Sequence, residues 1–361
     1  MESVEGPVLL LAVPGSGKTT VLVSRVGYMV YEKQIPPEQI LTVTYTVAAT
    51  RDMAARFART FGETWANRLE FRTINGLSAR IIQHYERVKG RQAFTLVTEE
   101  GRLAALVGEL YRKATGEFAA ESTVRSLRTA ITYCKNRQMT QEEIEAYQVE
   151  DIPFAKLYRQ YHAELRRRRW MDYDDQMVYA AQILRQHGDI LAYFQDKYRY
   201  LCVDEAQDTS RIQHTILKLL AGRRRNLFLV GDADQSIYGF RAADPGALLR
   251  FEEEYPGGRV LFLEKHYRST ATIVAAADRF IRQNQHRRDK HMVAARGPGP
   301  AIQPIWVADR VQQYAQLAQW AQDCDRETAV LYRNNDSALP LLDLLDRQGT
   351  GCRCRQMEGT F

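Results

Sequence analysis

A glycine-rich octapeptide near the start of the chain has the composition of a phosphate-binding loop. It follows an apolar run at residues 8–11 and precedes an apolar-periodic stretch at residues 21–30, which predicts a strand, a tight loop and a helix beginning near Lys18. Glycines let backbone N–H groups turn toward a polyphosphate, Lys18 can reach its β- and γ-phosphates, and Thr19 can hold Mg²⁺. Ala12 stands where the strict pattern has glycine, so the loop is a variant, and a chance Gly-Lys-Thr match is the alternative. The predicted nucleotide-binding residues of this loop are Ala12, Val13, Pro14, Gly15, Ser16, Gly17, Lys18, Thr19 and Thr20.

An acidic pair after a second apolar run supplies the other half of an NTPase site. Residues 200–203 run directly into Asp204 and Glu205. An aspartate at the end of a buried strand can ligate Mg²⁺, and the adjacent glutamate can polarise the water that attacks the γ-phosphate. Acidic pairs after strands also cap helices, which is the alternative for this pair taken alone. With the phosphate loop, the pattern predicts ATP and Mg²⁺ as cofactors, Thr19 and Asp204 as metal ligands, and Glu205 as a catalytic residue.

The remaining hydrophobic patterns predict an α/β fold with an insertion. Lys18 and Asp204 lie 186 residues apart, more than a compact sheet needs between neighbouring strands. From about Gln92 the strand pattern stops, and helical spacing of apolar residues predicts an all-helical insertion. The predicted strands are 40–44, 69–72, 226–230 and 259–263, and the predicted helical segments of the insertion are 103–111, 123–133 and 144–169.

The last part of the chain predicts a further structural unit. A Pro- and Gly-rich stretch at residues 296–300 is typical of a connection. Beyond it, apolar runs at 302–307 and 328–332 predict two strands around a helix at 310–323. These elements would begin a second strand-helix-strand domain.

The composition is that of a globular chain. It has 361 residues, 45% hydrophobic and 26% charged, with a formal net charge of +6. Arginine clusters at 166–169 and 223–225 suit a polyanion, although charge runs alone are as typical of solvated surface. The five scattered cysteines include no two pairs that would complete a zinc site. We expect a cytoplasmic protein with no membrane span and no signal peptide, because no run of 18 apolar residues occurs and no basic segment precedes the first apolar stretch.

Several further motifs, together with the two described above, resemble the UvrD/Rep/PcrA group of superfamily 1 DNA helicases. The similarity extends over almost the whole chain, which is more specific than a phosphate loop alone. The motifs are Asp-Glu-Ala-Gln-Asp-Thr at 204–209, Gly-Asp-Ala-Asp-Gln-Ser-Ile-Tyr-Gly-Phe-Arg at 231–241, Leu-Glu-Lys-His-Tyr-Arg-Ser at 263–269, and shorter matches at 44–46, 51–53, 73–75, 171–175 and 331–334.

This resemblance implies roles for three more residues in the ATP site. Gln235 follows a predicted strand, where the family uses the carboxamide to couple the ATP state to DNA grip. Arg268 corresponds to an arginine on the γ-phosphate, where a guanidinium stabilises the charge of the transition state. Tyr267 corresponds to the ring that stacks on adenine. Without the resemblance, the Gln235 amide would be interpreted as forming hydrogen bonds within its own loop.

Single-stranded DNA, alone or at a junction with duplex, is the partner that the resemblance implies. Such motors stack bases on aromatic side chains and add polar contacts to the backbone. Any of these aromatic side chains could instead be packed in the core. The corresponding DNA-binding residues are Thr44, Tyr45, Thr73, Asn75, Tyr238, Phe240 and Arg241.

Five departures from the family pattern fall in these motifs. Phe240 replaces a tryptophan, Tyr45 a phenylalanine and Asn75 a histidine. Residues 47–48 are Val-Ala instead of Asn-Lys, and His266 replaces an asparagine. The loss of one cation predicts an altered strand affinity or salt dependence.

Some family elements do not occur in the sequence. No glutamine precedes Ala12 to read adenine, and the chain ends before the motifs that supply a second arginine to the ATP cleft. An arginine finger is worth roughly three to five orders of magnitude in rate, so we expect an incomplete fragment that hydrolyses ATP slowly.

The sequence therefore predicts an α/β chain of three parts. A RecA-like P-loop NTPase domain with a parallel sheet spans 1–91 and 171–267, an all-helical insertion spans 92–170, and a partial second RecA-like domain spans 268–361. The predicted function is an ATP-dependent DNA helicase or translocase, with 3′-to-5′ polarity implied by the resemblance only. The alternatives are an ATP-dependent DNA-binding switch that does not unwind and an AddA-type helicase-nuclease subunit.

Overall fold

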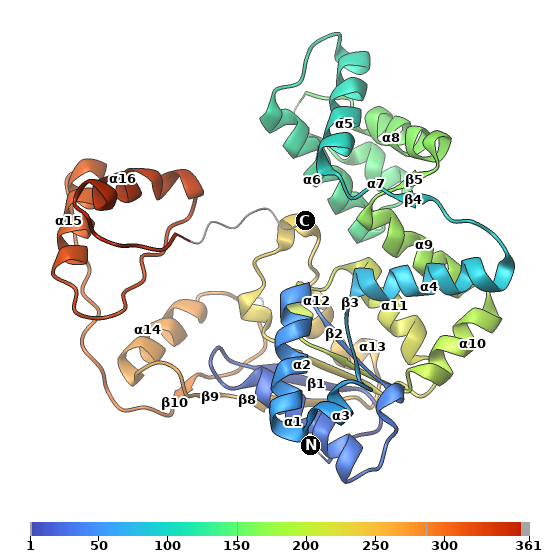
Figure 1. Ribbon diagram of the computed structural model, residues 1–361, viewed down its shortest axis with the longest axis horizontal. Coiled ribbons are helices and arrows are strands. Elements are labelled where there is room, and N and C mark those ends of the chain that lie inside the picture. The colour runs from blue at the N-terminus through green and yellow to red at the C-terminus, as the bar shows by residue number, and fades with distance from the viewer. Residues whose placement is uncertain (1, 150, 286, 355–361) are drawn as a thin grey trace. The chain divides into compact units, whose positions relative to one another are not determined.

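The computed structural model describes residues 2–149, 151–285 and 287–354, and its first compact unit, which ends at residue 299, is built on a six-stranded parallel sheet (Figure 1). In its register Leu9 lies opposite Leu229, and Leu41 lies opposite Leu201. Each strand was predicted to within one residue at either end. The strand order is β3 (Glu70–Thr73), β2 (Ile40–Thr44), β6 (Tyr200–Val203), β7 (Leu227–Gly231), β1 (Val8–Ala12) and β8 (Arg259–Leu263). Because the strands are parallel, the loops that follow them gather at one edge of the sheet.

Alternate residues of the strands face two separate apolar cores. Leu9 and Leu11 pack into one core, and Val8 and Leu10 pack into the other. Helices cover both faces, which is why the central strands are continuously apolar (Figure 1). The first face carries α4 (Ile74–Lys89), α9 (Tyr173–Gln186), α10 (Gly188–Lys197) and α11 (Arg211–Ala221), and the second carries α1 (Lys18–Tyr31), α2 (Val47–Phe61) and α3 (Glu63–Ala66).

The predicted insertion is a helical subdomain with an apolar core of its own. The helix predicted at 144–169 is divided in two, because residues 147–149 and 151–153 are not helical and Pro153 precedes the second helix. Two short strands, β4 (Thr95–Leu96) and β5 (Trp170–Met171), pair at the borders of the insertion, where the sequence predicted no strand. The helices are α5 (Glu100–Thr115), α6 (Glu121–Arg137), α7 (Gln141–Ala146) and α8 (Phe154–Arg168).

Short elements frame the end of the first compact unit. The two-residue strand β9 (Lys265–His266) pairs with β10 (Val293–Ala294), and α14 (Ala271–Ile281) lies between them in sequence. The helices α12 (Gly246–Leu249) and α13 (Phe251–Glu254) precede β8. The first compact unit ends at residue 299, inside the predicted Pro- and Gly-rich connection, whereas the sequence placed the start of a second domain at 268.

The second compact unit, residues 300–361, contains two α-helices among its described residues. The predicted helix is present as α15 (Arg310–Gln322), and it packs on α16 (Leu339–Arg347) through Ala318, Leu341 and Leu345. The prediction of strands at 302–307 and 328–332 was wrong, since neither segment forms a strand. A strand needs neighbours to satisfy its N–H and C=O groups and to cover its side chains, and here Trp306 and Leu331 are each more than nine-tenths exposed. No helix in the described part of the chain is long and apolar enough to cross a membrane.

Candidate active site

The predicted phosphate loop connects β1 to α1. Gly15 and Gly17 adopt φ values of +65° and +90°, which side chains with a Cβ rarely tolerate. The Ser16 hydroxyl donates to the Val13 carbonyl (2.6 Å), so the loop folds back on itself. Within the described residues, no side chain caps α1, and the N–H groups of its first turn remain available to an anion.

The side chains of Lys18 and Glu205 form an ion pair, although a strand lies between the two strands that precede these residues in sequence. The sheet order puts β7 between β1 and β6, yet Lys18 Nζ lies 3.0 Å from Glu205 Oε2. Glu205 has a left-handed backbone (φ +49°), which turns the chain sharply after β6. The Gln207 amide also donates to Glu205 Oε2 (2.7 Å). The predicted loop lysine and catalytic glutamate therefore share one site.

The aspartates beside Glu205 carry raised pKa values. Burial, with the charge of Glu205 added to it, raises the pKa of Asp204 to about 6 and that of Asp208 to about 6. Asp208 Oδ1 is buried and has no hydrogen-bond partner among the described residues. Carboxylate and hydroxyl oxygens fit Mg²⁺, and within the described part of the chain no cluster of three or more acidic, His or Cys side chains would hold a metal unaided. This chemistry suits a cation that also binds phosphates, for which Thr19 and Asp204 were the predicted protein ligands.

Gln207 joins the ends of β6 and β7 and was not among the predicted site residues. Its side-chain oxygen accepts from the Asp232 N–H (2.9 Å). A Cβ at Gly231 would lie 2.7 Å from that oxygen and 3.1 Å from the Gln207 backbone nitrogen. The close approach requires glycine at 231, and a glycine at the end of an apolar strand was the signal in the sequence.

The predicted sensor Gln235 is held by Asp232. Gln235 Nε2 donates to Asp232 Oδ2 (2.6 Å), and Asp232 is fully buried. Lys290 forms ion pairs with Asp232 and with Asp234 (3.2 Å to the latter), and Arg287 pairs with Asp234 at 2.8 Å. Sequence reasoning missed Lys290 and Arg287, because they lie more than 50 residues from the aspartates that they contact.

Tyr267 and Arg268 lie against the phosphate loop. The Tyr267 N–H donates to the Gly15 carbonyl (3.0 Å), and a Cβ on Gly15 would lie 2.9 Å from Arg268 Cβ. His266 Nδ1 contacts the Pro14 carbonyl. Both predicted side chains are exposed, with 56% of Tyr267 accessible. These contacts place both residues beside the loop that was predicted to hold phosphates.

Aromatic side chains from two motifs meet next to the acidic loop. Tyr45, directly after β2, stacks on Tyr238, with ring centroids 5.2 Å apart and an interplanar angle of 28°. Phe240 follows at 5.9 Å from Tyr238 and is 52% exposed, so it is not a core residue. Arg241 belongs to the same 3₁₀ turn, and its side chain lies outside the described part of the structure.

The predicted polar DNA contacts line a small pocket with the acidic pair. Thr44, Thr73 and Asn75 share this pocket with Asp204 and Glu205. The Thr73 hydroxyl accepts from the Gly76 N–H (3.1 Å) and caps α4, whereas Asn75 Oδ1 is buried without a hydrogen-bond partner among the described residues. The pocket therefore connects the two groups of predicted residues.

Comparison with known proteins gives a family match over most of the chain. The UvrD/REP helicase N-terminal domain matches residues 1–256. The chain belongs to the UvrD/REP helicase family. The ATP-dependent DNA helicase PcrA of Staphylococcus epidermidis is 34% identical over 344 residues, 93% of this chain and 47% of that protein. PcrA of Staphylococcus aureus is 32% identical over 350 residues, with the same coverage, so the chain spans about half the length of the curated relatives it matches.

The motif at 171–175 of this UvrD/REP family member forms a buried ion network. Lys135 Nζ lies 2.6 Å from Asp172 Oδ2 and 2.8 Å from Asp175 Oδ1. Asn136 donates to Asp174 (2.7 Å) and accepts from the Ser210 hydroxyl (2.8 Å), just beyond the acidic loop. The motif thus ties α6 of the insertion to the start of α11.

Proposed function

We propose that this chain binds ATP and Mg²⁺ and couples ATP hydrolysis to movement along single-stranded DNA, as the motor segment of an ATP-dependent DNA helicase. The contact between Lys18 and Glu205 carries this proposal, since it puts a phosphate ligand and a group that can activate water 3.0 Å apart. The curated relatives are helicases by name, which supports the same activity.

The proposed chemistry depends on Lys18 exchanging its carboxylate partner for a phosphate. A bound γ-phosphate would compete with Glu205 for Lys18, and Glu205, still held by Gln207, would then be available to polarise water. Bound Mg²⁺, held by Thr19 and Asp204, would neutralise charge on the phosphates. Arg268 would stabilise the transition state, and Tyr267 would stack on the base.

Strand binding would use the loops at the carboxyl edge of the sheet. Tyr45, Tyr238 and Phe240 would stack bases, while Thr44, Thr73 and Asn75 would contact the backbone. Gln235 and the shared pocket connect these loops to the ATP site, so nucleotide state and DNA affinity would change together. Polarity from 3′ to 5′ and binding at single-strand/duplex junctions belong to the same proposal.

A test of this function measures the affinity of the chain for fluorescent oligo(dT) with and without Mg-ATP, together with DNA-stimulated ATP turnover. Lys18→Ala should remove the effect of nucleotide on DNA affinity, because it removes the phosphate ligand. Phe240→Ala should weaken DNA binding by about 1–3 kcal/mol by removing a stacking ring. Lys113→Ala, on the exposed surface of α5, is the matched lysine control.

The outcomes separate the functions. DNA affinity that never responds to nucleotide would contradict the coupled motor. Nucleotide-dependent binding without turnover, in this chain and in a longer chain that contains it, would favour a DNA-binding switch.

A further inference from the structure

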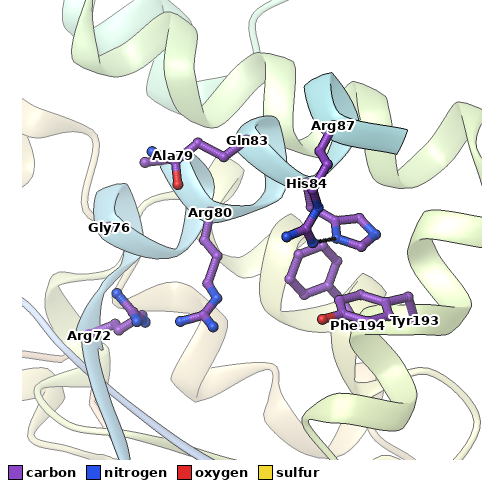
Figure 2. Close-up of a pocket in the computed structure, with 9 residues that line it drawn as sticks. All are labelled: Arg72, Gly76, Ala79, Arg80, Gln83, His84, Arg87, Tyr193 and Phe194. Carbon is purple, nitrogen blue, oxygen red and sulfur yellow. Dashed lines mark hydrogen bonds between the residues drawn. The ribbon is translucent and has the colours of Figure 1, made fainter. Parts of the chain in front are cut away.

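A second hollow, of about 450 Å³, lies between α4 and α10, and none of the residues that line it belongs to the proposed ATP site (Figure 2). One face of α4 lines it, at positions spaced three or four residues apart from Gly76 to Arg87. Gly76 and Ala79 contribute little or no side chain, which leaves the hollow open. Tyr193 and Phe194 of α10 close its other side (Figure 2).

The hollow has an excess of positive charge. Arg72 donates to Glu70 Oε2 through Nε (2.7 Å), and Arg80 donates to the same oxygen through Nη1 (3.1 Å). Lys197 pairs with the other oxygen of Glu70 at 2.9 Å. Three cations therefore share one carboxylate, and Arg72 and Arg80 line the hollow, at side-chain exposures of 34% and 37%. An anion in the hollow would meet guanidinium groups that Glu70 neutralises only in part.

Arg87 extends this positive surface along α4. Its Nη2 lies 3.0 Å from His84 Nδ1, and since a guanidinium can only donate, His84 accepts at Nδ1 and carries its proton on Nε2. Burial and the charge of Arg87 lower the pKa of His84, which keeps this imidazole neutral near pH 7. A neutral imidazole does not offset the positive charge of Arg87, which lies at the surface.

A flat aromatic surface accompanies the cations. The rings of His84 and Tyr193 stack, with centroids 4.1 Å apart and an interplanar angle of 13°. Tyr193 is 44% exposed, whereas Phe194 beneath it is fully buried. A half-exposed ring fixed from behind by packing, next to arginines, is the combination that binds single-stranded nucleic acid.

The residues that line the hollow are neighbours in sequence of the proposed DNA-binding residues. Arg72 immediately precedes Thr73 on β3, and the Gly76 N–H donates to the Thr73 hydroxyl. β3 is an edge strand of the sheet, so no further strand separates the carboxyl edge from this side of the domain. A DNA strand that crosses Thr73 and Asn75 would therefore have the hollow as its neighbour on this side.

Resting on the proposed function, we propose that the α4–α10 hollow is a further binding site for single-stranded DNA. Its arginines would hold backbone phosphate, and Tyr193 would stack one base. The site extends the strand path beyond the loops that contact the ATP site.

Oligo(dT) binding by the whole chain at several salt concentrations tests this proposal. Arg87→Glu should weaken binding about 10-fold to 100-fold, the effect of removing a charge-assisted hydrogen bond. It should also reduce the slope of log affinity against log salt by about 0.7 for each phosphate that the chain no longer neutralises. Tyr193→Ala should weaken binding about fivefold to 100-fold, whereas Tyr193→Phe, which keeps the ring, should bind as the unchanged chain does.

Arg59→Glu, an exposed arginine on α2, is the matched charge control and should have a small effect on both affinity and slope. Normal binding by Arg87→Glu and Tyr193→Ala, while Phe240→Ala is impaired, would overturn the hollow as a DNA site and leave the proposed function standing. If the same two variants bind oligo(dT) normally but no longer bind poly(glutamate), the hollow is a site for an acidic peptide and the DNA proposal is overturned. If the unchanged chain does not bind oligo(dT), both proposals fail.

Discussion

Two acidic clusters of this chain, each paired with a lysine, differ in their access to solvent. At the end of β6, the side chains of Lys18 and Glu205 are 12% and 40% exposed. After β5, the side chains of Lys135, Asp172 and Asp175 are 2%, 10% and 4% exposed. Both clusters follow a short strand, and both form ion pairs of 3.0 Å or less.

The difference teaches which ion pair can take part in chemistry. An exposed pair can give up one partner to a ligand, because water and the ligand take the place of that partner. A sealed pair cannot, since each charge would be left in a medium of low dielectric constant. The cluster around Lys18 is therefore suited to turnover, and the cluster around Lys135 to fixing α6 and α9 together.

Substitution of the exposed carboxylate should have the largest effect, and on rate. Glu205→Gln keeps the shape of the side chain but removes the group proposed to polarise water. In a longer chain that contains this one, we expect DNA-stimulated ATP turnover to fall about 100-fold to 10,000-fold, with Mg-ATP binding retained. Steady-state phosphate release and nucleotide titration measure the two effects. Equal turnover in Glu205→Gln and the unchanged chain would remove Glu205 from this role.

Substitution of the sealed lysine should change stability. Lys135→Met keeps the length of the side chain but leaves the carboxylates of Asp172 and Asp175 without their cation. We expect the free energy of unfolding in urea to fall by about 3–5 kcal/mol. Lys113→Met, which removes an exposed lysine paired with Glu109, is the control and should be unchanged within error. If both variants unfold alike, the network around Lys135 does not stabilise the fold.

A smaller effect on the same network depends on pH. Burial and the charge of Asp172 raise the pKa of Asp174 to about 6, so the folded chain binds a proton there that the unfolded chain releases near pH 4. Its contribution to stability is present below pH 4 and is lost as pH rises through about 6. Relative to Asp174→Asn, the unchanged chain should therefore be more stable at pH 4 than at pH 7, by on the order of 1–3 kcal/mol. Urea titrations of both chains at the two pH values measure this, and a constant difference between them would contradict it.

The sequence predicted the strands and the phosphate loop because both are local. A buried parallel strand is a short apolar run between turn residues, and β2, β6 and β8 were predicted with their observed bounds. The loop at 12–19 needs glycine at two left-handed positions, so its composition identifies it. The strands predicted at 302–307 and 328–332 do not form, because an apolar run becomes a strand only where neighbouring strands pair with it, which is not a local property.

What the sequence determined by itself, then, was the set of elements, the identity of the chemical groups and the family resemblance, all of which depend on residue types at short spacing. Only the tertiary structure decided which groups meet. It brought Lys290 to Asp232 and Arg80 to Glu70, and it sealed Lys135 while leaving Lys18 accessible. Burial and long-range contact arise from how distant segments pack, and no local spacing of residues encodes the dielectric surroundings of a charge.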